Sequence, residues 1–114
     1  MTDANHYHSP EDASYGKVYK KETPEILEAF GAFNSAVFAA EGRELDLKTR
    51  ELIAIGVATA TKCVYCIEAH ATNAVKAGAT DAEIAEAAWV STAIQAGGGL
   101  THGRLAFKFA EHAH

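Results

Sequence analysis

Two cysteines and one histidine lie at a spacing that could support thiol chemistry. The chain contains two cysteines, in the run Cys63-Val64-Tyr65-Cys66. His70 follows Cys66 by four residues, so on a helix Cys63, Cys66 and His70 lie at i, i+3 and i+7 on one face. A helix N-terminus near the pair would stabilise a thiolate, the form of cysteine that attacks a peroxide or a disulfide. The spacing therefore favours redox chemistry.

Two other interpretations of these residues stay open at the level of the sequence. The cysteines could be small apolar residues of the core. Alternatively, Cys63, Cys66 and His70 could provide three ligands to zinc, although the chain has no second ligand pair at zinc-finger spacing. His70 by itself would suit a buried structural role, and only its register with the cysteines favours a shared site.

Glu51 is the other unusual residue, because its carboxylate projects from an apolar helix face. On a helical wheel it lies among four apolar residues, Leu47, Ala54, Ile55 and Ala58. A partly desolvated carboxylate beside an imidazole has the composition of a proton relay. The helix that carries Glu51 is suited to pack beside the cysteine helix, but whether Glu51 meets His70 stays open.

The remaining candidates are weaker. We expect the histidines near the two ends to be solvated: His6, His8, His112 and His114. His102 follows a glycine run and could either line a pocket or cap a helix. Trp89 is expected in the core.

The composition favours an all-α fold. The chain has 114 residues, 48% of them hydrophobic and 22% charged, which suits one folded domain over residues 9–114 after a disordered tail at 1–8. It contains 24 alanines and two prolines, and no run alternates between apolar and polar residues as a strand would.

Capping signals predict about six helices, at 10–20, 24–40, 47–61, 63–77, 81–96 and 100–112. Ser9-Pro10 and Thr23-Pro24 each pair an N-cap hydroxyl with a proline at the first helical position. Thr80 and Glu83 have the spacing of a capping box. The expected stops are glycines, at Gly42, Gly78 and Gly97–Gly99.

Apolar surface is abundant for so small a domain. One stripe on helix 24–40 is expected to face the core, and it comprises Ile26, Leu27, Phe30, Phe33 and Val37. Residues 52–60 and 85–96 are apolar or small on nearly all sides. Surface of this kind needs a partner, so we expect a homo-oligomer.

Charge and hydropathy exclude two classes of partner. The net charge of −5 disfavours binding to a nucleic-acid backbone. No run approaches the roughly 18 apolar residues of a membrane span. The first twelve residues are polar and acidic, without the basic and apolar regions of a signal peptide, so a cytoplasmic protein is expected.

Glu51, Cys63-x-x-Cys66 and His70, with the acidic residue twelve positions before the first cysteine, resemble the core of a known superfamily. It is the alkyl hydroperoxidase D (AhpD)-like, carboxymuconolactone decarboxylase superfamily, and the resemblance covers residues 24–107. It implies an all-α homotrimer or homohexamer with a thiol-based peroxidase or disulfide-reductase site and no bound cofactor.

By this resemblance Cys66 would attack the hydroperoxide, assisted by His70 and Glu51. Cys63 would then resolve the Cys66 sulfenic acid to a disulfide, and an external thiol or dithiol would reduce it. General thiol chemistry leaves the first attack open, because the first cysteine of a CxxC helix is often the more acidic, whereas His70 lies closer in sequence to Cys66.

The chain departs from the pattern of the peroxidase members at one position. They resemble CxHC, whereas Tyr65 precedes the second cysteine here, so one proton-relay group is replaced by a phenol. Two alternative functions follow: decarboxylase-like activity on a small carboxylated metabolite, or a non-catalytic redox-sensing or metal-binding module. The decarboxylase branch is not expected to need a CxxC pair.

Overall fold

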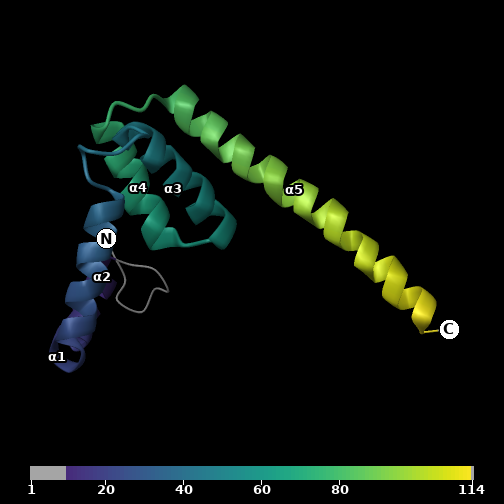
Figure 1. Cartoon of the computed structure of the whole chain (residues 1–114), viewed down its shortest axis with the longest axis horizontal. Coiled ribbons are helices and arrows are strands. Elements are labelled where there is room, and N and C mark those ends of the chain that lie inside the picture. Colours follow the sequence, from purple (N-terminus) through teal and green to yellow (C-terminus); the bar gives the residue numbers. More distant parts are fainter. Residues whose placement is uncertain (1–9, 114) are drawn as a thin grey trace. The chain divides into compact units, whose positions relative to one another are not determined.

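The computed structural model describes residues 10–113 and confirms the all-α prediction, with no strand among these residues (Figure 1). A 3₁₀ helix, η1, spans Pro10–Gly16. Five α-helices follow it: α1 (Lys17–Glu22), α2 (Pro24–Val37), α3 (Leu47–Thr61), α4 (Val64–Lys76) and α5 (Asp81–His112). Within these residues no helix is long and apolar enough to cross a membrane.

The chain divides into two compact units, Met1–Glu44 and Leu45–His114. A single domain over residues 9–114 stays a prediction, and the expected tail at residues 1–8 lies outside the described residues. Every residue that the sequence singled out for thiol chemistry lies in the second unit.

The first unit differs from its prediction in two respects. The expected helix at 10–20 is instead a 3₁₀ helix followed by α1, and Thr23 does not cap α2, because its hydroxyl donates to Tyr19 O at 3.1 Å. The apolar stripe of α2 is exposed rather than in the core, with Phe30 and Phe33 62% and 65% exposed. Two short helices cannot by themselves enclose such a stripe.

The second unit is built on α3, which packs against α4 and α5. The Asp46 carboxylate caps α3 by accepting from Thr49 N–H at 2.7 Å, and this bond holds the pKa of Asp46 below its usual value. The side of α3 that faces α4 carries the buried Ile55 and Ala58, and Ala74 of α4 is fully buried. Residues 52–60, which are apolar or small, are thus only partly buried, since Val57 is 57% exposed.

The start of α5 has the predicted capping box. Glu83 N–H donates to Thr80 Oγ1 at 3.1 Å, and Thr80 N–H donates to Glu83 Oε1 at 2.9 Å. The second carboxylate oxygen of Glu83 accepts from Lys48 Nζ at 2.7 Å, which links the starts of α3 and α5. The Lys48 ammonium, with the Thr80 amide, lowers the pKa of Glu83, and Glu83 raises the pKa of Lys48.

The predicted stop at Gly97–Gly99 is wrong, because α5 continues through these glycines to His112. A glycine ends a helix by adopting a left-handed conformation, and Gly78 does so just after α4, with φ of 98°. Gly42 also has a positive φ, 80°, but it lies in the loop beyond α2, which ends at Val37. The three glycines of α5 keep helical backbone instead, at a cost of about 1 kcal/mol each relative to alanine. Trp89, expected in the core, is 70% exposed on α5.

Candidate active site at the start of α4

The two cysteines form a disulfide at the first turn of α4, with their Cα atoms 5.2 Å apart. Cys63 is the N-cap residue of the helix, and its sulfur accepts a hydrogen bond from Cys66 N–H at 3.2 Å. The predicted position of the pair at a helix N-terminus is therefore confirmed. Both residues are partly buried, so reagents in solution can reach the site.

A tight junction between α3 and α4 fixes the position of Cys63. Lys62 ends α3 in the left-handed conformation, with φ of 57°, and Cys63 N–H donates back to Ala58 O at 3.0 Å. Cys63 then adopts extended backbone and begins α4. The first cysteine is thus held by helix ends on both sides rather than by a long loop.

Glu51 and His70 meet between α3 and α4. Glu51 Oε2 lies 2.6 Å from His70 Nδ1, and Glu51 is 2% exposed while the His70 side chain is 20% exposed. With a carboxylate as acceptor, Nδ1 carries the proton and the ring orientation is fixed. Nε2 is then the nitrogen that can exchange a proton with a reacting group.

The structure therefore brings together the four residues selected from the sequence. Cys63 is the N-cap of α4, Cys66 and His70 lie on its first two turns, and Cys66 and His70 are separated by about one helical turn. Glu51 comes from α3 and reaches the same helix. The cysteine pair thus lies at the start of α4, and the next turn of the same helix carries the His70 imidazole, which the Glu51 carboxylate orients.

Among the described residues, the weaker candidates His102 and His112 do not join this site. His102 and His112 are exposed residues of α5, whereas His6, His8 and His114 lie outside the described residues. Tyr65, on the first turn of α4, is 48% exposed. Among the described residues no cluster of three or more histidine, cysteine or acidic side chains is arranged to hold a metal ion.

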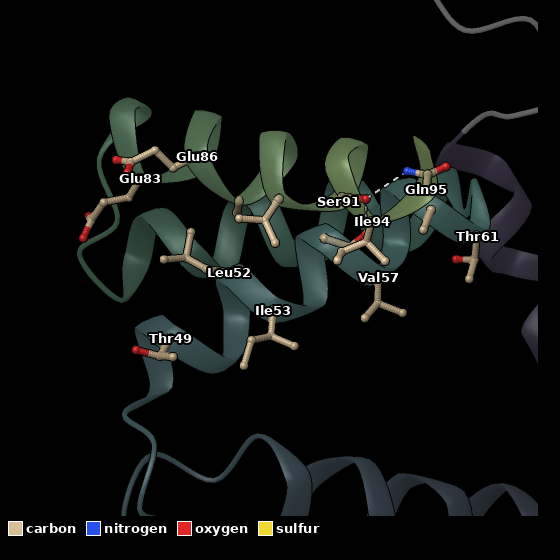
Figure 2. Close-up of a pocket in the computed structure, with 14 residues that line it drawn as sticks. Thr49, Leu52, Ile53, Val57, Thr61, Glu83, Glu86, Ser91, Ile94 and Gln95 are labelled. Atoms are coloured by element: carbon tan, nitrogen blue, oxygen red, sulfur yellow. Dashed lines mark hydrogen bonds between the residues drawn. The ribbon is translucent and has the colours of Figure 1, made fainter. Parts of the chain in front are cut away.

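A groove that the sequence did not predict lies between α3 and α5 (Figure 2). Its volume is about 720 Å³, and both helices supply largely apolar side chains, among them Ile53, Val57 and Ile94. Figure 2 shows the hydrogen bond between Gln95 and Ser91 in this groove. The residues that line it extend along α3 as far as Thr61, two positions before Cys63.

A polar cluster joins the two helices at the groove. The Ser91 hydroxyl donates to Gly56 O at 2.8 Å and accepts from Thr59 Oγ1 and Gln95 Nε2, each at 3.0 Å. Ser91 is 8% exposed, so these bonds satisfy a buried hydroxyl. A sequence signal was present, because Ser91 and Gln95 are polar residues at i and i+4 in a segment that is mostly apolar or small.

Comparison with known proteins identifies a family for this chain. Residues 24–109 match the model of the carboxymuconolactone decarboxylase family. An uncharacterized protein of the cox locus of Paracoccus denitrificans is 43% identical over 81 residues, which make up 71% of each chain. A protein of Haemophilus influenzae is 46% identical over 74 residues, 65% of this chain and 63% of that protein.

Solved structures agree in fold. A protein of Methanobacterium thermoautotrophicum aligns with a TM-score of 0.68 and 37% identity, over 76% of this chain and 98% of that chain. A carboxymuconolactone decarboxylase family protein of Legionella pneumophila aligns with a TM-score of 0.67 and 29% identity, over 90% and 89%. The resemblance inferred from Glu51, the CxxC pair and His70 is thereby confirmed, and the chain belongs to the carboxymuconolactone decarboxylase family.

Proposed function

We propose that this protein reduces hydroperoxides through Cys63 and Cys66. The observation that carries the proposal is the Glu51–His70 pair, 2.6 Å apart, whose imidazole lies one helical turn from a cysteine that can form a disulfide. A buried carboxylate that orients a histidine suits proton transfer better than packing alone. Family membership and the CxxC pair support a redox role, and peroxide is the substrate class that the proposal adds.

The first step is the attack of the Cys66 thiolate on the terminal oxygen of the hydroperoxide. A sulfur–oxygen bond forms and the oxygen–oxygen bond breaks, so that sulfur is oxidised to a sulfenic acid and the peroxide is reduced to an alcohol. The leaving alkoxide takes one proton. His70, oriented by Glu51, would first accept the Cys66 thiol proton at Nε2 and then return it to the leaving oxygen.

The second step joins the two cysteines. The Cys63 sulfur attacks the Cys66 sulfenic sulfur, a disulfide forms, and the hydroxyl leaves as water with the proton of the Cys63 thiol. In the disulfide form the two Cα atoms lie 5.2 Å apart, within the usual range for a disulfide.

The third step restores the dithiol. A thiolate of the external reductant attacks the Cys66 sulfur, so that a mixed disulfide with Cys66 forms and Cys63 leaves as a thiolate. A second thiol, from the same dithiol or from another molecule, then attacks the reductant sulfur of the mixed disulfide, which releases Cys66 as a thiolate and completes the disulfide of the reductant. Cys66 N–H already donates to the Cys63 sulfur, and the same bond would stabilise the departing negative charge. The N-cap position thus supports the proposed roles, with Cys63 as the leaving group and Cys66 as the nucleophile.

A thiol titration tests the proposal. The reduced protein is freed of reductant and given one equivalent of cumene hydroperoxide, and free thiols are counted over time. Wild type should lose both thiols much faster than free cysteine does. Cys63→Ser should give a trappable sulfenic acid on Cys66, whereas Cys66→Ser should not react at an enhanced rate.

Two results would contradict the proposal in different ways. Thiol loss no faster than that of free cysteine would remove peroxide as the substrate while leaving disulfide exchange available to the pair. A sulfenic acid that forms only when Cys63 is retained would keep the reaction but reverse the two roles.

A further inference from the structure

The residue before Cys63 has an unusual backbone. Lys62 ends α3 with φ of 57° and ψ of 38°, and it is the one residue other than glycine with a positive φ in the part of the chain that the structure describes. An L side chain is strained in this left-handed region, so the position is usually filled by glycine or asparagine. Gly78 supplies the left-handed residue after α4. The sequence thus has a lysine where a smaller residue would be less strained.

No contact of the Lys62 side chain accounts for this lysine. The side chain is exposed, and its ammonium has no hydrogen-bond or ion-pair partner among the described residues of its unit. Backbone bonds hold the junction, since Lys62 N–H and Cys63 N–H both donate to Ala58 O. Glycine or asparagine would make the same two bonds. What lysine adds to the junction is its positive charge.

This charge enters a part of the fold that is otherwise uncharged. Between positions 52 and 67 Lys62 is the one basic or acidic residue, histidine included. Tyr65 lies in the same run, but its phenol is neutral near pH 7. Helix α5 packs against α3, and its residues 87–101 contain no basic or acidic residue either. No neighbouring charge within these runs offsets the Lys62 ammonium.

The next ionisable groups along α3 and α4 do not replace it. Glu51 and His70 pair with each other at 2.6 Å, so the Glu51 charge acts on the imidazole. Glu68 is exposed on the second turn of α4, where solvent and salt screen its charge. Lys62 is therefore the fixed positive charge beside Cys63.

We propose that Lys62 stabilises negative charge on the Cys63 sulfur and thereby speeds the reduction of the disulfide. The inference rests on the third step of the proposed function. In that step a reductant thiolate forms a bond to the Cys66 sulfur, the Cys63–Cys66 bond breaks, and its electron pair stays on the Cys63 sulfur. This charge develops one residue from Lys62. A surface charge a few ångströms away changes such a rate by roughly threefold at low salt.

The rate of disulfide reduction tests the inference without any peroxide. Oxidised protein is mixed with dithiothreitol at neutral pH and low ionic strength, the reaction is stopped with an alkylating agent, and free thiols are counted by mass spectrometry. Lys62→Asn removes the charge and keeps a residue that tolerates the left-handed conformation, so reduction should be roughly threefold slower. Lys62→Gly, which removes the backbone strain as well, should be slowed to the same extent.

Two variants control for the loss of charge. Lys62→Arg keeps the positive charge and should react at the wild-type rate. Lys76→Asn removes the same net charge from an exposed position about 20 Å away along α4, and it should also match wild type. Urea unfolding verifies that all four variants are folded under the conditions of the assay.

Salt and the thiol pKa distinguish an effect of charge from an effect of structure. The rates of wild type and Lys62→Asn should converge at about 1 M salt, where the screening length is about 3 Å. In a Cys66→Ser background, the ultraviolet absorbance of the thiolate reports the pKa of Cys63. Lys62→Asn should raise this pKa, with a roughly threefold lower acid dissociation constant. A purely structural role for Lys62 would change neither result.

Three results would overturn the inference. Equal reduction rates for wild type and folded Lys62→Asn would mean that the charge does not act on the pair. A rate for Lys62→Arg as low as that of Lys62→Asn would assign the effect to the shape of the side chain. A factor that grows from cysteamine to mercaptoacetate, as the reductant thiol becomes more negative, would place the effect on the incoming reductant instead of on Cys63.

These outcomes are distinguishable from failure of the proposed function. None of the reduction assays contains a peroxide, so a negative result for Lys62 leaves hydroperoxide reduction by Cys66 standing. Conversely, thiol loss with cumene hydroperoxide no faster than that of free cysteine would remove the peroxide step and leave the effect of Lys62 on disulfide exchange to be measured in the same way.

Discussion

Glu51 is a carboxylate with almost no exposed surface, and its position explains what it contributes. Its Oε2 atom lies 2.6 Å from His70 Nδ1, and the surrounding α3 face is apolar. A glutamine would preserve the shape and could still accept from Nδ1–H, but it would not supply the negative charge that stabilises a protonated imidazole.

We therefore predict that Glu51→Gln slows peroxide-dependent thiol loss by roughly a hundredfold, the usual scale for general acid–base assistance. Glu68→Gln, at an exposed position on α4, is the matched control and should react at the wild-type rate. The rates are measured by thiol titration of reduced protein. Equal rates for Glu51→Gln and wild type would show that the Glu51–His70 pair is structural.

The Lys48–Glu83 pair predicts a pH dependence of stability. Lys48 lowers the pKa of Glu83, so the pair stabilises the fold above the usual carboxyl range, and this contribution is lost as the pH falls through the lowered value. Lys48 has a raised pKa, so its contribution is present below the usual lysine range and is lost at strongly alkaline pH. Both groups are partly exposed, which keeps the effect small and sensitive to salt.

Between pH 6 and 9 we expect Lys48→Met to melt slightly below wild type, and we expect the two melting temperatures to converge towards about pH 3. Lys76→Met, an exposed position on the last turn of α4, should show no such convergence. Thermal melts followed by circular dichroism across this range provide the measurement. A difference that persists unchanged at pH 3 would assign the effect to packing of the Lys48 side chain.

At the residue scale the sequence was sufficient to choose the site but not to assemble it. The i, i+3, i+7 spacing on α4 predicted that Cys63, Cys66 and His70 share a face, because a helix fixes such relations locally. The contact of Glu51 with His70 depends on the packing of α3 against α4, which the local pattern does not determine. The Ser91 cluster was missed for the same reason, since its partners are Thr59 and the Gly56 carbonyl on another helix.

At the scale of the helix, α5 shows how a strong local signal can be overruled. Three successive glycines predict the end of a helix, yet α5 continues through them. The low helix propensity of glycine is therefore outweighed by the helical residues on either side. Capping was more reliable where a side-chain bond or a positive φ enforces the end, as at Thr80 and Gly78. Thr23 is a counter-example, because its hydroxyl donates to Tyr19 O in the preceding helix and does not cap α2.

These two kinds of glycine should respond in opposite directions to alanine. A Cβ at Gly98 meets nothing within 4 Å, so Gly98→Ala should raise the free energy of unfolding by about 0.5–1 kcal/mol. Gly78 has φ of 98°, where a side chain is strained, so Gly78→Ala should lower it by about 1 kcal/mol or more. Urea unfolding measures both, and a destabilised Gly98→Ala would reveal a close contact from outside the chain.

At the scale of the whole molecule, the exposed apolar surface of α5 predicts that thermal stability depends on protein concentration. If a homo-oligomer covers exposed apolar residues of α5 such as Leu100 and Phe107, the folded state is stabilised by mass action, and the melting temperature of wild type should rise by a few degrees over a hundredfold increase in concentration. Leu100→Glu should melt at a temperature that depends less on concentration, while Thr101→Glu, at an exposed polar position on the same turn, should behave as wild type. Calorimetry provides the measurement. A flat wild-type profile would contradict a reversible oligomer.

The hydrogen bond that caps α4 at Cys63 determines how far the first turn of the helix must rearrange during a catalytic cycle. Cys66 N–H donates to the Cys63 sulfur in the oxidised protein, and a thiolate at the same position would accept that bond more strongly. The first turn of α4 therefore needs no rearrangement when electrons enter or leave the pair. Amide hydrogens of this turn should exchange with solvent at similar rates in the two redox states, because the same backbone conformation serves both.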